Sequence, residues 1–312
     1  MDKTDVILTQ LLMQNSRRPY RELAEILNLS INAIHKRIQE LIKIGILRDF
    51  TAKIDLSAFE MSIVAAWVWG RSECKLLDEI ITKLGANSSI YWISFASGNL
   101  LYLGAHLEDI SKLEPFLDFV KKEGKIPDPT FAIIDLPVHH PSSTTRKRLL
   151  SSLDYKIIFS LNKNSRKSVT EISKELNFST KTIKRRLSKM IDEGLIELSV
   201  EFYPDASNDI SAVFHLILKA SINKSEVISL LINNYSPNIL APLVCNNLPN
   251  LILCVVWANT MKEINDIRQR FENEDVFESV KLNILHTGHI FDTWRDEFLR
   301  KKVLTPKTKI NS

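Results

Sequence analysis

Apolar residues recur three to four positions apart in three short runs near the start of the chain. The first run holds Val6 and Leu11, the second Leu23 and Leu27, and the third extends from Ile34 to Ile42. This spacing puts the apolar side chains of each run on one face of a helix. Residues 15–19 and 28–29 separate the runs, and a glycine at position 45 follows the third. The pattern therefore predicts three short helices joined by tight turns.

The same pattern occurs a second time. Residues 5–47 align without a gap with residues 154–196, at an offset of 149 positions. Asn15-Ser16-Arg17 matches Asn164-Ser165-Arg166, and Arg37 matches Arg186. An ungapped match of this length indicates an internal duplication, and repeats of this kind decide the domain organisation.

The rest of each half alternates between strand-like and helix-like segments. Strands are predicted at 64–70, 90–95, 100–106 and 130–136, and at 213–220, 239–245, 251–257 and 280–286. Helices are predicted at 76–84 and 110–122, and at 225–232 and 262–274. Each half thus reads as three helices followed by β-α-β-β-α-β. The predicted fold class is α+β, built as two tandem repeats.

A short second helix, a tight turn and a serine-capped third helix indicate a helix-turn-helix. Ser30 and Ser179 are the predicted caps, because a serine hydroxyl accepts a backbone N–H of the first turn. Small polar residues at the start of the third helix permit close approach to bases, and cations one turn later neutralise phosphates. The candidate DNA-binding residues are Ser30, Asn32, Ala33, His35, Lys36, Arg37, Ser179, Thr180, Lys181, Thr182, Lys184, Arg185, Arg186 and Lys189. Arg37 and Arg186 also fall near the buried stripe, which leaves a structural role open for both.

Charge is segregated along the chain. The net charge is only +4, but residues 5–53 carry eight basic and five acidic side chains, and residues 154–200 carry ten and six. The intervening α+β segments are acidic, with seven basic and twelve acidic side chains over 54–138. Basic helical modules joined to acidic modules favour a reader of double-stranded DNA attached to domains with another task.

The first module resembles the leucine-responsive regulatory protein (Lrp/AsnC) family of bacterial and archaeal transcription regulators. The resemblance rests on Asp5, the Asn15-Ser16-Arg17 step, Ser30, Arg37, Gly45-Ile46-Leu47 and residues 50–55. Residues 46–55 look extended, as the wing of such a module would be. The resemblance implies a winged helix-turn-helix followed by a ferredoxin-like regulatory domain (RAM, ACT-like) in each repeat. The expected domains are 1–55 (winged helix-turn-helix), 56–138 (RAM-like), 139–153 (basic linker), 154–203 (second winged helix-turn-helix), 204–290 (second RAM-like) and 291–312 (amphipathic helix and basic tail).

The resemblance also implies partners. Members of the family dimerise through their regulatory domains, so two units in one chain imply an intramolecular pseudo-dimer, and a homodimer or higher oligomer of chains is expected. The family's effector site maps onto Ser97, Gly98, Asn99 and Leu100, where an amino-acid-like small molecule would bind. The alternative is that Gly98-Asn99 is simply a hairpin turn, for which such residues are needed in any case.

Other chemistry has weaker support. Cys245 and Cys254 flank the corresponding turn of the second half, where a hairpin would allow them to lie opposite each other. Two buried thiols are the favoured interpretation, and a redox pair is the alternative. A metal site needs further ligands at a suitable spacing, and the sequence places none beside His139-His140 or beside His286 and His289. No metal and no cofactor are therefore expected. The sequence has no apolar run long enough to cross a membrane, and its first residues do not have the pattern of a signal peptide. A cytoplasmic protein without a membrane segment is therefore expected.

Three functions follow in order of preference. The first is a sequence-specific DNA-binding transcription regulator without catalytic residues. The second is an enzyme, because the siroheme decarboxylases, a branch of similar proteins, pair two such units without using DNA. Their substrate bears many carboxylates, however, and the acidic α+β modules lack matching cations. The third is an interaction scaffold, which the retained basic helix faces argue against.

Overall fold

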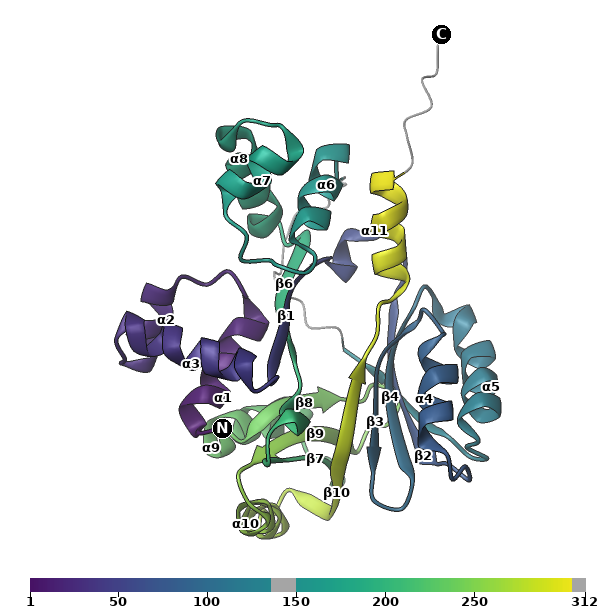
Figure 1. Cartoon of the computed structure of the whole chain (residues 1–312). Coiled ribbons are helices and arrows are strands. Elements are labelled where there is room, and N and C mark those ends of the chain that lie inside the picture. The colour runs from purple at the N-terminus through teal and green to yellow at the C-terminus, as the bar shows by residue number, and fades with distance from the viewer. Residues whose placement is uncertain (136–149, 305–312) are drawn as a thin grey trace.

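The computed structural model describes residues 1–135 and 150–304 and confirms the two three-helix modules (Figure 1). The first consists of α1 (Lys3–Gln14), α2 (Tyr20–Leu27) and α3 (Ile31–Lys43), and the second of α6 (Ser152–Leu161), α7 (Val169–Leu176) and α8 (Thr180–Asp192). The second module begins before residue 154, because Ser151 caps α6 and exchanges hydrogen bonds with Asp154. Of the expected linker at 139–153, the residues up to 149 lie outside the described part of the chain.

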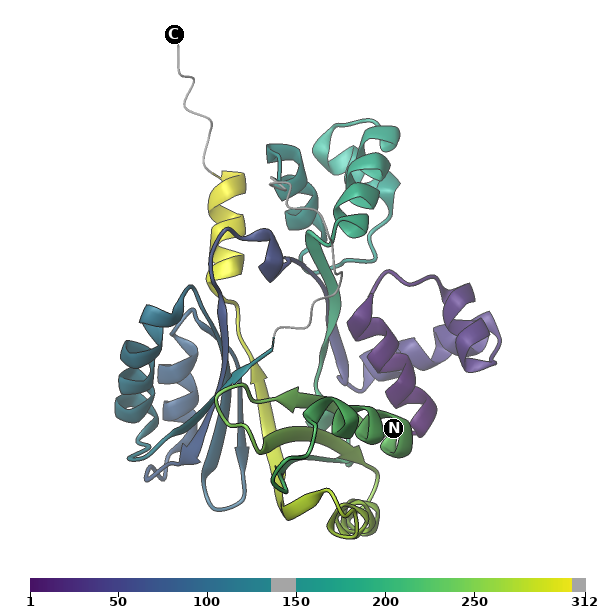
Figure 2. The same cartoon turned by 180° about the vertical axis from the view of Figure 1, so that it is seen from behind.

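The segment after each module is a strand, but the two strands pair with each other. β1 (Leu47–Ile54) and β6 (Ile196–Phe202) form an antiparallel two-stranded ribbon with Ala52 opposite Leu198. Residues 47–54 are thus extended, as predicted for a wing, but their partner is the equivalent strand of the other repeat. The ribbon joins the two helical modules, which extend to the same side of it in Figures 1 and 2.

Each half continues as the predicted β-α-β-β-α-β unit. The first unit comprises β2 (Val64–Arg71), α4 (Leu77–Gly85), β3 (Ile90–Ala96), β4 (Leu100–Leu107), α5 (Leu113–Gly124) and β5 (Thr130–Ile134). The second comprises β7 (Ile210–Leu218), α9 (Lys224–Tyr235), β8 (Ile239–Val244), β9 (Leu251–Ala258), α10 (Met261–Glu272) and β10 (Phe277–Ile290). Short 3-10 turns, η1 (Leu56–Ala58), η2 (Ile110–Lys112) and η3 (Pro204–Ala206), complete the order.

The two units share one eight-stranded sheet of order β5-β2-β4-β3-β10-β7-β9-β8. Each half has its last strand beside its first and its third beside its second, the arrangement of a ferredoxin-like sheet. β10 extends beyond the predicted 280–286 because residues 285–290 pair with β3 and join the halves. A bridge between Ile134 and Cys245 brings the two outer edges together as well. The helices pack on separate cores, one for each half, and a third core of side chains from both halves lies on the inner face.

The predicted C-terminal helix is present as α11 (Trp294–Leu304), and residues 305–312 lie outside the described part. Leu299 is buried in the core of the second helical module. The indole N–H of Trp294 donates to the carbonyl oxygen of His106 at 2.8 Å. The helix therefore joins the second helical module to the first half of the sheet.

One arrangement that the sequence allowed is not found in the structure. Cys254 lies opposite Pro242 in the β8–β9 pair, so it does not face Cys245. Cys254 belongs to the core beneath the helices of the second half, whereas Cys245 belongs to the inner core. Both thiols are free and buried. None of the helices in the described ranges is long and apolar enough to cross a membrane.

Candidate nucleic-acid interface

The third helix of each module is positioned by the same local chemistry. The residue at the start of each turn, Asn28 or Asn177, adopts the left-handed conformation, with φ of 52° and 55°. Asparagine tolerates this conformation better than most residues, which permits a tight turn. The Ser30 hydroxyl then accepts the N–H of Ala33 at 3.1 Å, and the Ser179 hydroxyl accepts that of Thr182 at 3.2 Å. Both predicted caps are therefore confirmed.

α3 presents a mixed polar face to solvent. Asn32, His35 and Lys36 are exposed, and Ala33 is half-buried. The ring of His35 packs edge-on against Tyr20 at 5.6 Å between centroids. The face is sparsely charged, so its contribution to a nucleic-acid complex would rest on hydrogen bonding and shape more than on charge.

α8 presents a strongly basic face. Lys181, Lys184 and Arg185 are exposed and make no ion pair among the described residues. Lys189 is also exposed and lies 3.9 Å from Glu193. At the start of the helix, Ser179 and Thr180 are exposed, and the Ser179 and Thr182 hydroxyl oxygens lie 2.9 Å apart. Free cations one turn after small polar residues suit a helix that enters a groove and contacts the flanking phosphates.

Two of the candidate residues are engaged within their own module. Arg37 donates to Asp5 at 2.7 Å and to Asp2 at 2.8 Å, which ties α3 to the start of α1. Arg186 forms the matching pair with Asp154 at the start of α6, with one bond of 2.7 Å. The acidic partners raise the pKa of Arg37. Both arginines therefore brace the third helix against the first, and the structural alternative noted for them has direct geometric support.

The two modules are held together by a reciprocal exchange at the ribbon. The hydroxyl oxygens of Ser16 and Ser165 lie 2.6 Å apart, and both residues are fully buried. Arg17 donates across to the carbonyl oxygen of Lys167 at 2.7 Å, and Arg166 donates back to that of Arg18 at 3.2 Å. The Asn-Ser-Arg step that marked the repeat is thus the contact between the repeats, and it fixes the separation of the two third helices.

Further contacts hold each helical module in place. The N-terminal ammonium group of Met1 pairs with Asp209 at 2.8 Å, and Gln10 donates to the Ile239 carbonyl oxygen at 2.8 Å. Leu299 of α11 is buried in the core of the second module, and Arg295 of the same helix donates to the ribbon, to the Ile54 carbonyl oxygen at 3.2 Å and to Glu197 at 2.7 Å. The first module therefore contacts the second half of the sheet, and the second module is held through α11.

The candidate effector segment, Ser97 to Leu100, forms the hairpin turn between β3 and β4. Ala96 pairs with Leu100, so the loop has three residues, and two of them, Gly98 and Asn99, have positive φ, at 71° and 55°, a conformation that glycine and asparagine tolerate. Arg71 donates to the Gly98 carbonyl oxygen at 2.7 Å, and Asn99 donates to that of Cys74 at 3.3 Å. The conformation of the turn is by itself enough to explain why glycine and asparagine occur there, and effector binding at this turn stays a prediction.

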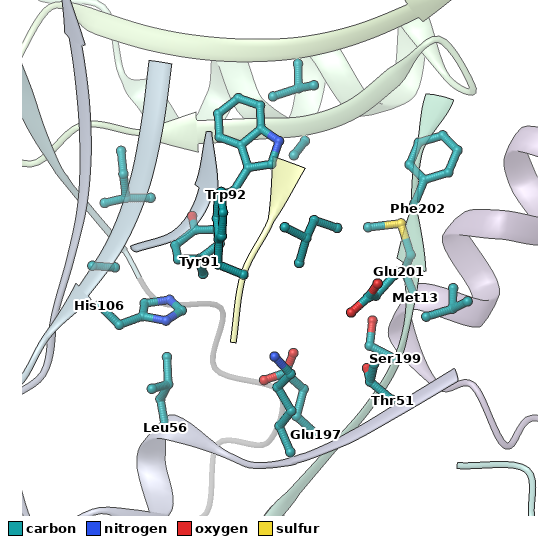
Figure 3. Close-up of a pocket in the computed structure, with 18 of the residues that line it drawn as sticks. Met13, Thr51, Leu56, Tyr91, Trp92, His106, Glu197, Ser199, Glu201 and Phe202 are labelled. Atoms are coloured by element: carbon teal, nitrogen blue, oxygen red, sulfur yellow. The ribbon is translucent and has the colours of Figure 1, made fainter. Parts of the chain in front are cut away.

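A large cavity that the sequence did not reveal lies between the ribbon and the sheet. Its volume is about 1420 Å³, and Figure 3 shows side chains reaching it from α1, β1, β3, β4 and β6. Of the described residues that line it, eight are acidic, whereas only Lys53 and Arg295 are lysine or arginine. No single stretch of sequence signals this site, because its walls come from segments far apart in the chain. Among the described residues, no cluster of three or more His, Cys, Asp or Glu side chains has the form of a metal site.

Comparison with known proteins agrees with this architecture. Residues 1–42 match the model of the AsnC-type helix-turn-helix domain, and residues 150–197 match that of a winged helix-turn-helix DNA-binding family. These matches support the resemblance to the Lrp/AsnC family that the sequence indicated. An uncharacterised HTH-type transcriptional regulator of Pyrococcus abyssi is 46% identical over 56 residues, which cover 18% of this chain and 38% of that protein. The chain thus spans less than two fifths of the length of this relative.

Two further comparisons cover longer stretches. The HTH-type transcriptional regulator FL11 of Pyrococcus horikoshii is 26% identical over 142 residues, which cover 45% of this chain and 91% of that protein. The duplicated architecture is also that of a crystal structure of the siroheme decarboxylase NirDL, with a TM-score of 0.59 and 12% identity over 97% of this chain and 98% of that one. At this identity the likeness extends to the fold alone. Both halves of the chain thus match a known fold.

Proposed function

We propose that this protein is a sequence-specific double-stranded DNA-binding transcription regulator without catalytic activity. One observation carries the proposal, the pairing of two capped helix-turn-helix modules. Arg17 and Arg166 each donate a hydrogen bond to the other module and so hold the two modules together. In the second module, three exposed cations of the third helix make no ion pair among the described residues. Two DNA-binding modules held at a fixed separation can contact two half-sites on one double-stranded DNA. We call these two modules the reading heads. As a regulator of chromosomal genes, the protein would act in the cytoplasm.

The two heads would read different sequences. α3 carries Asn32 and His35 where α8 carries Lys181 and Lys184. Since amides and cations bind different base edges, one chain would recognise two unlike half-sites. The basic face of α8 would supply most of the phosphate contacts.

The sheet would serve as the regulatory part. Its two halves already form a pairing of the kind that family members build between subunits, through β3 and β10. A homodimer or higher oligomer of chains, which we also propose, would then use another surface of the RAM-like domains and present four reading heads. Light scattering of the purified protein measures this directly, and a monomer alone with and without DNA would contradict the oligomer.

The enzyme alternative is favoured by one observation, the whole-chain fold likeness combined with the large cavity. Siroheme carries many carboxylates, however, and the two lining cations are already paired, Lys53 with Asp296 and Arg295 with Glu197. A polyanionic substrate would meet mainly carboxylates, which costs free energy. The geometry thus supports the regulator better.

Selection of genomic DNA fragments by the purified protein, followed by footprinting, tests the proposal. We expect a protected site with two unlike halves. Absence of any preferred fragment, together with an absorption spectrum of a bound tetrapyrrole, would favour the enzyme. Absence of both would favour an interaction scaffold.

A further inference from the structure

The lining of the cavity has an excess of negative charge, and one of its carboxylates lies outside ion-pair distance of every cation in the described residues. Glu201 on β6 makes no ion pair within the described ranges, and its only hydrogen bond there comes from the Tyr203 hydroxyl at 3.4 Å. Burial, together with the nearby carboxylate of Asp49, raises the pKa of Glu201. A half-buried carboxylate without a cation at ion-pair distance is a site that a positive charge would stabilise. Asp205, which also lines the cavity, accepts only the backbone N–H of Gly288 among the described donors, at 3.3 Å.

The opposite wall is aromatic and rigid. Trp67 and Trp92 stack at 5.0 Å between centroids with an interplanar angle of 28°, and Tyr91 stacks on His106 at 4.5 Å and 20°. The indole N–H of Trp67 donates to the Tyr91 hydroxyl at 2.8 Å. Tyr91 fits here because Gly104 has no side chain: a Cβ at that position would lie 2.4 Å from the tyrosine ring. These contacts hold flat π-faces in fixed positions beside the cavity.

One polar atom in this wall has no partner. The Nδ1 atom of His106 is buried and makes no hydrogen bond to any described residue. Burial lowers the pKa of His106 to about 3, so the ring is neutral at physiological pH. Figure 3 shows His106 and Glu201 on opposite sides of the cavity, with Trp92 between them along one wall.

We propose that the cavity binds a planar aromatic cation, with its positive charge against Glu201 and its ring system on the Trp67–Trp92 wall. A cation gains from both surfaces, because the carboxylate attracts it and the aromatic faces stabilise it through cation–π contact. The volume of about 1420 Å³ exceeds that of an ordinary small-molecule site, so a ligand of three or more fused rings fits. An anion of the same size would be repelled by the same carboxylates. This inference does not depend on DNA binding.

Two dyes of similar size and opposite charge test the proposal. Rhodamine 6G is a fused-ring cation, and fluorescein is the corresponding anion. We expect saturable binding of rhodamine 6G by fluorescence polarisation and at least tenfold weaker binding of fluorescein. Equal affinities, or no binding of rhodamine 6G, would overturn the proposal.

Variants of the full-length protein locate the site. Glu201→Gln removes the negative charge and should weaken rhodamine 6G binding about tenfold. Glu226→Gln, at an exposed position of α9, is the matched control and should bind as the unchanged protein does. Trp92→Leu should weaken binding of the dye and reduce the quenching of tryptophan fluorescence that it causes. Thermal melting verifies that each variant is folded, and wild-type dye affinity in folded Glu201→Gln would overturn the assignment. DNA binding is measured separately, so failure of either proposal is recognised independently.

Discussion

The hydroxyl oxygens of Ser16 and Ser165 lie 2.6 Å apart, and the two residues are separated by 149 positions, the same offset as the sequence repeat. Equivalent residues of two repeats meet in this way only where a local two-fold relation passes between them. The pair is fully buried and flanked by the arginines that cross between the modules. The duplication thus forms an isologous contact inside one chain.

Removal of one hydroxyl of this pair should lower the free energy of unfolding by more than half of the loss caused by removal of both. Ser16→Ala or Ser165→Ala alone leaves a buried hydroxyl without this partner, so we expect each to lower the free energy of unfolding by about 1–2 kcal/mol. The double variant should lose less than the sum of the two, because no orphaned hydroxyl remains. Urea denaturation of the four proteins measures the coupling, and strictly additive losses would contradict a direct bond.

Arg186 should matter for stability and Arg185 for DNA. Arg186→Ala leaves Asp154, which is only 4% exposed, without its cation. Because Arg186 itself is partly exposed, we expect a loss of about 2–3 kcal/mol rather than the full cost of a buried pair. Arg185→Ala, at an exposed position without an ion pair among the described residues, should change stability by about 0.5 kcal/mol or less. Equal thermal shifts for the two variants would show that Arg186 does not brace the module.

Arg295 should hold the ribbon against the first half of the sheet. It is 5% exposed and donates to both strands of the ribbon. Arg295→Met leaves the carboxylate of Glu197 without this ion-pair partner, so we expect the free energy of unfolding to fall by about 3 kcal/mol. The added change Glu197→Gln should restore part of this loss. Arg300→Met breaks an exposed pair with Asp292 and is the control, with an expected change of about 0.5 kcal/mol or less. No recovery in the double variant would contradict the role of the buried pair.

Two buried histidines should make the fold sensitive to mild acid. Burial lowers the pKa of His106 to about 3 and that of His215 to about 4. Both stay neutral in the folded protein while the unfolded chain takes up protons below the ordinary pKa of 6.5, so stability is present above that pH and is lost as the pH falls.

The loss should approach about 1.4 kcal/mol per pH unit for each histidine between about pH 6.5 and pH 5. His106→Phe, which keeps an aromatic ring over Tyr91, should remove about half of the joint contribution to the slope. Urea denaturation across this range measures the slope, and an unchanged slope in the variant would show that His106 is protonated in the folded state.

Local chemistry made much of the fold predictable. The helix caps at Ser30 and Ser179, the apolar periodicity and the turn at Gly98-Asn99 each act within a few residues, and each was confirmed. The order of strands and helices followed from the same short-range patterns. The C-terminal helix was also expected, but its anchoring role was not, because Arg295 finds its partners almost 100 and more than 240 positions away.

Long-range pairing limited the rest. The sequence placed an extended segment after the first module, yet nothing in residues 47–54 specifies that β6 is their partner, because strand pairing depends on the position of the whole second repeat. The sequence also allowed Cys245 to face Cys254, and the structure differs for a related reason: neighbouring strand positions alternate between faces, and a shift of one residue in register moves a side chain to the other side. The cavity likewise depends on elements that meet only in the folded chain.

The salt dependence of DNA binding is the most direct test of whether the basic face of α8 contacts DNA. We would compare the wild-type protein with the double variant Lys184→Ala plus Arg185→Ala, and with Lys121→Ala plus Lys122→Ala on α5 as the matched exposed control. Each phosphate contact contributes about 0.9 to the slope of log affinity against log salt. We expect that loss of Lys184 and Arg185 lowers the slope by about two and weakens binding, whereas the control leaves both unchanged. An unchanged slope in the Lys184 and Arg185 variant, or no binding of DNA by the wild-type protein, would contradict the proposed function.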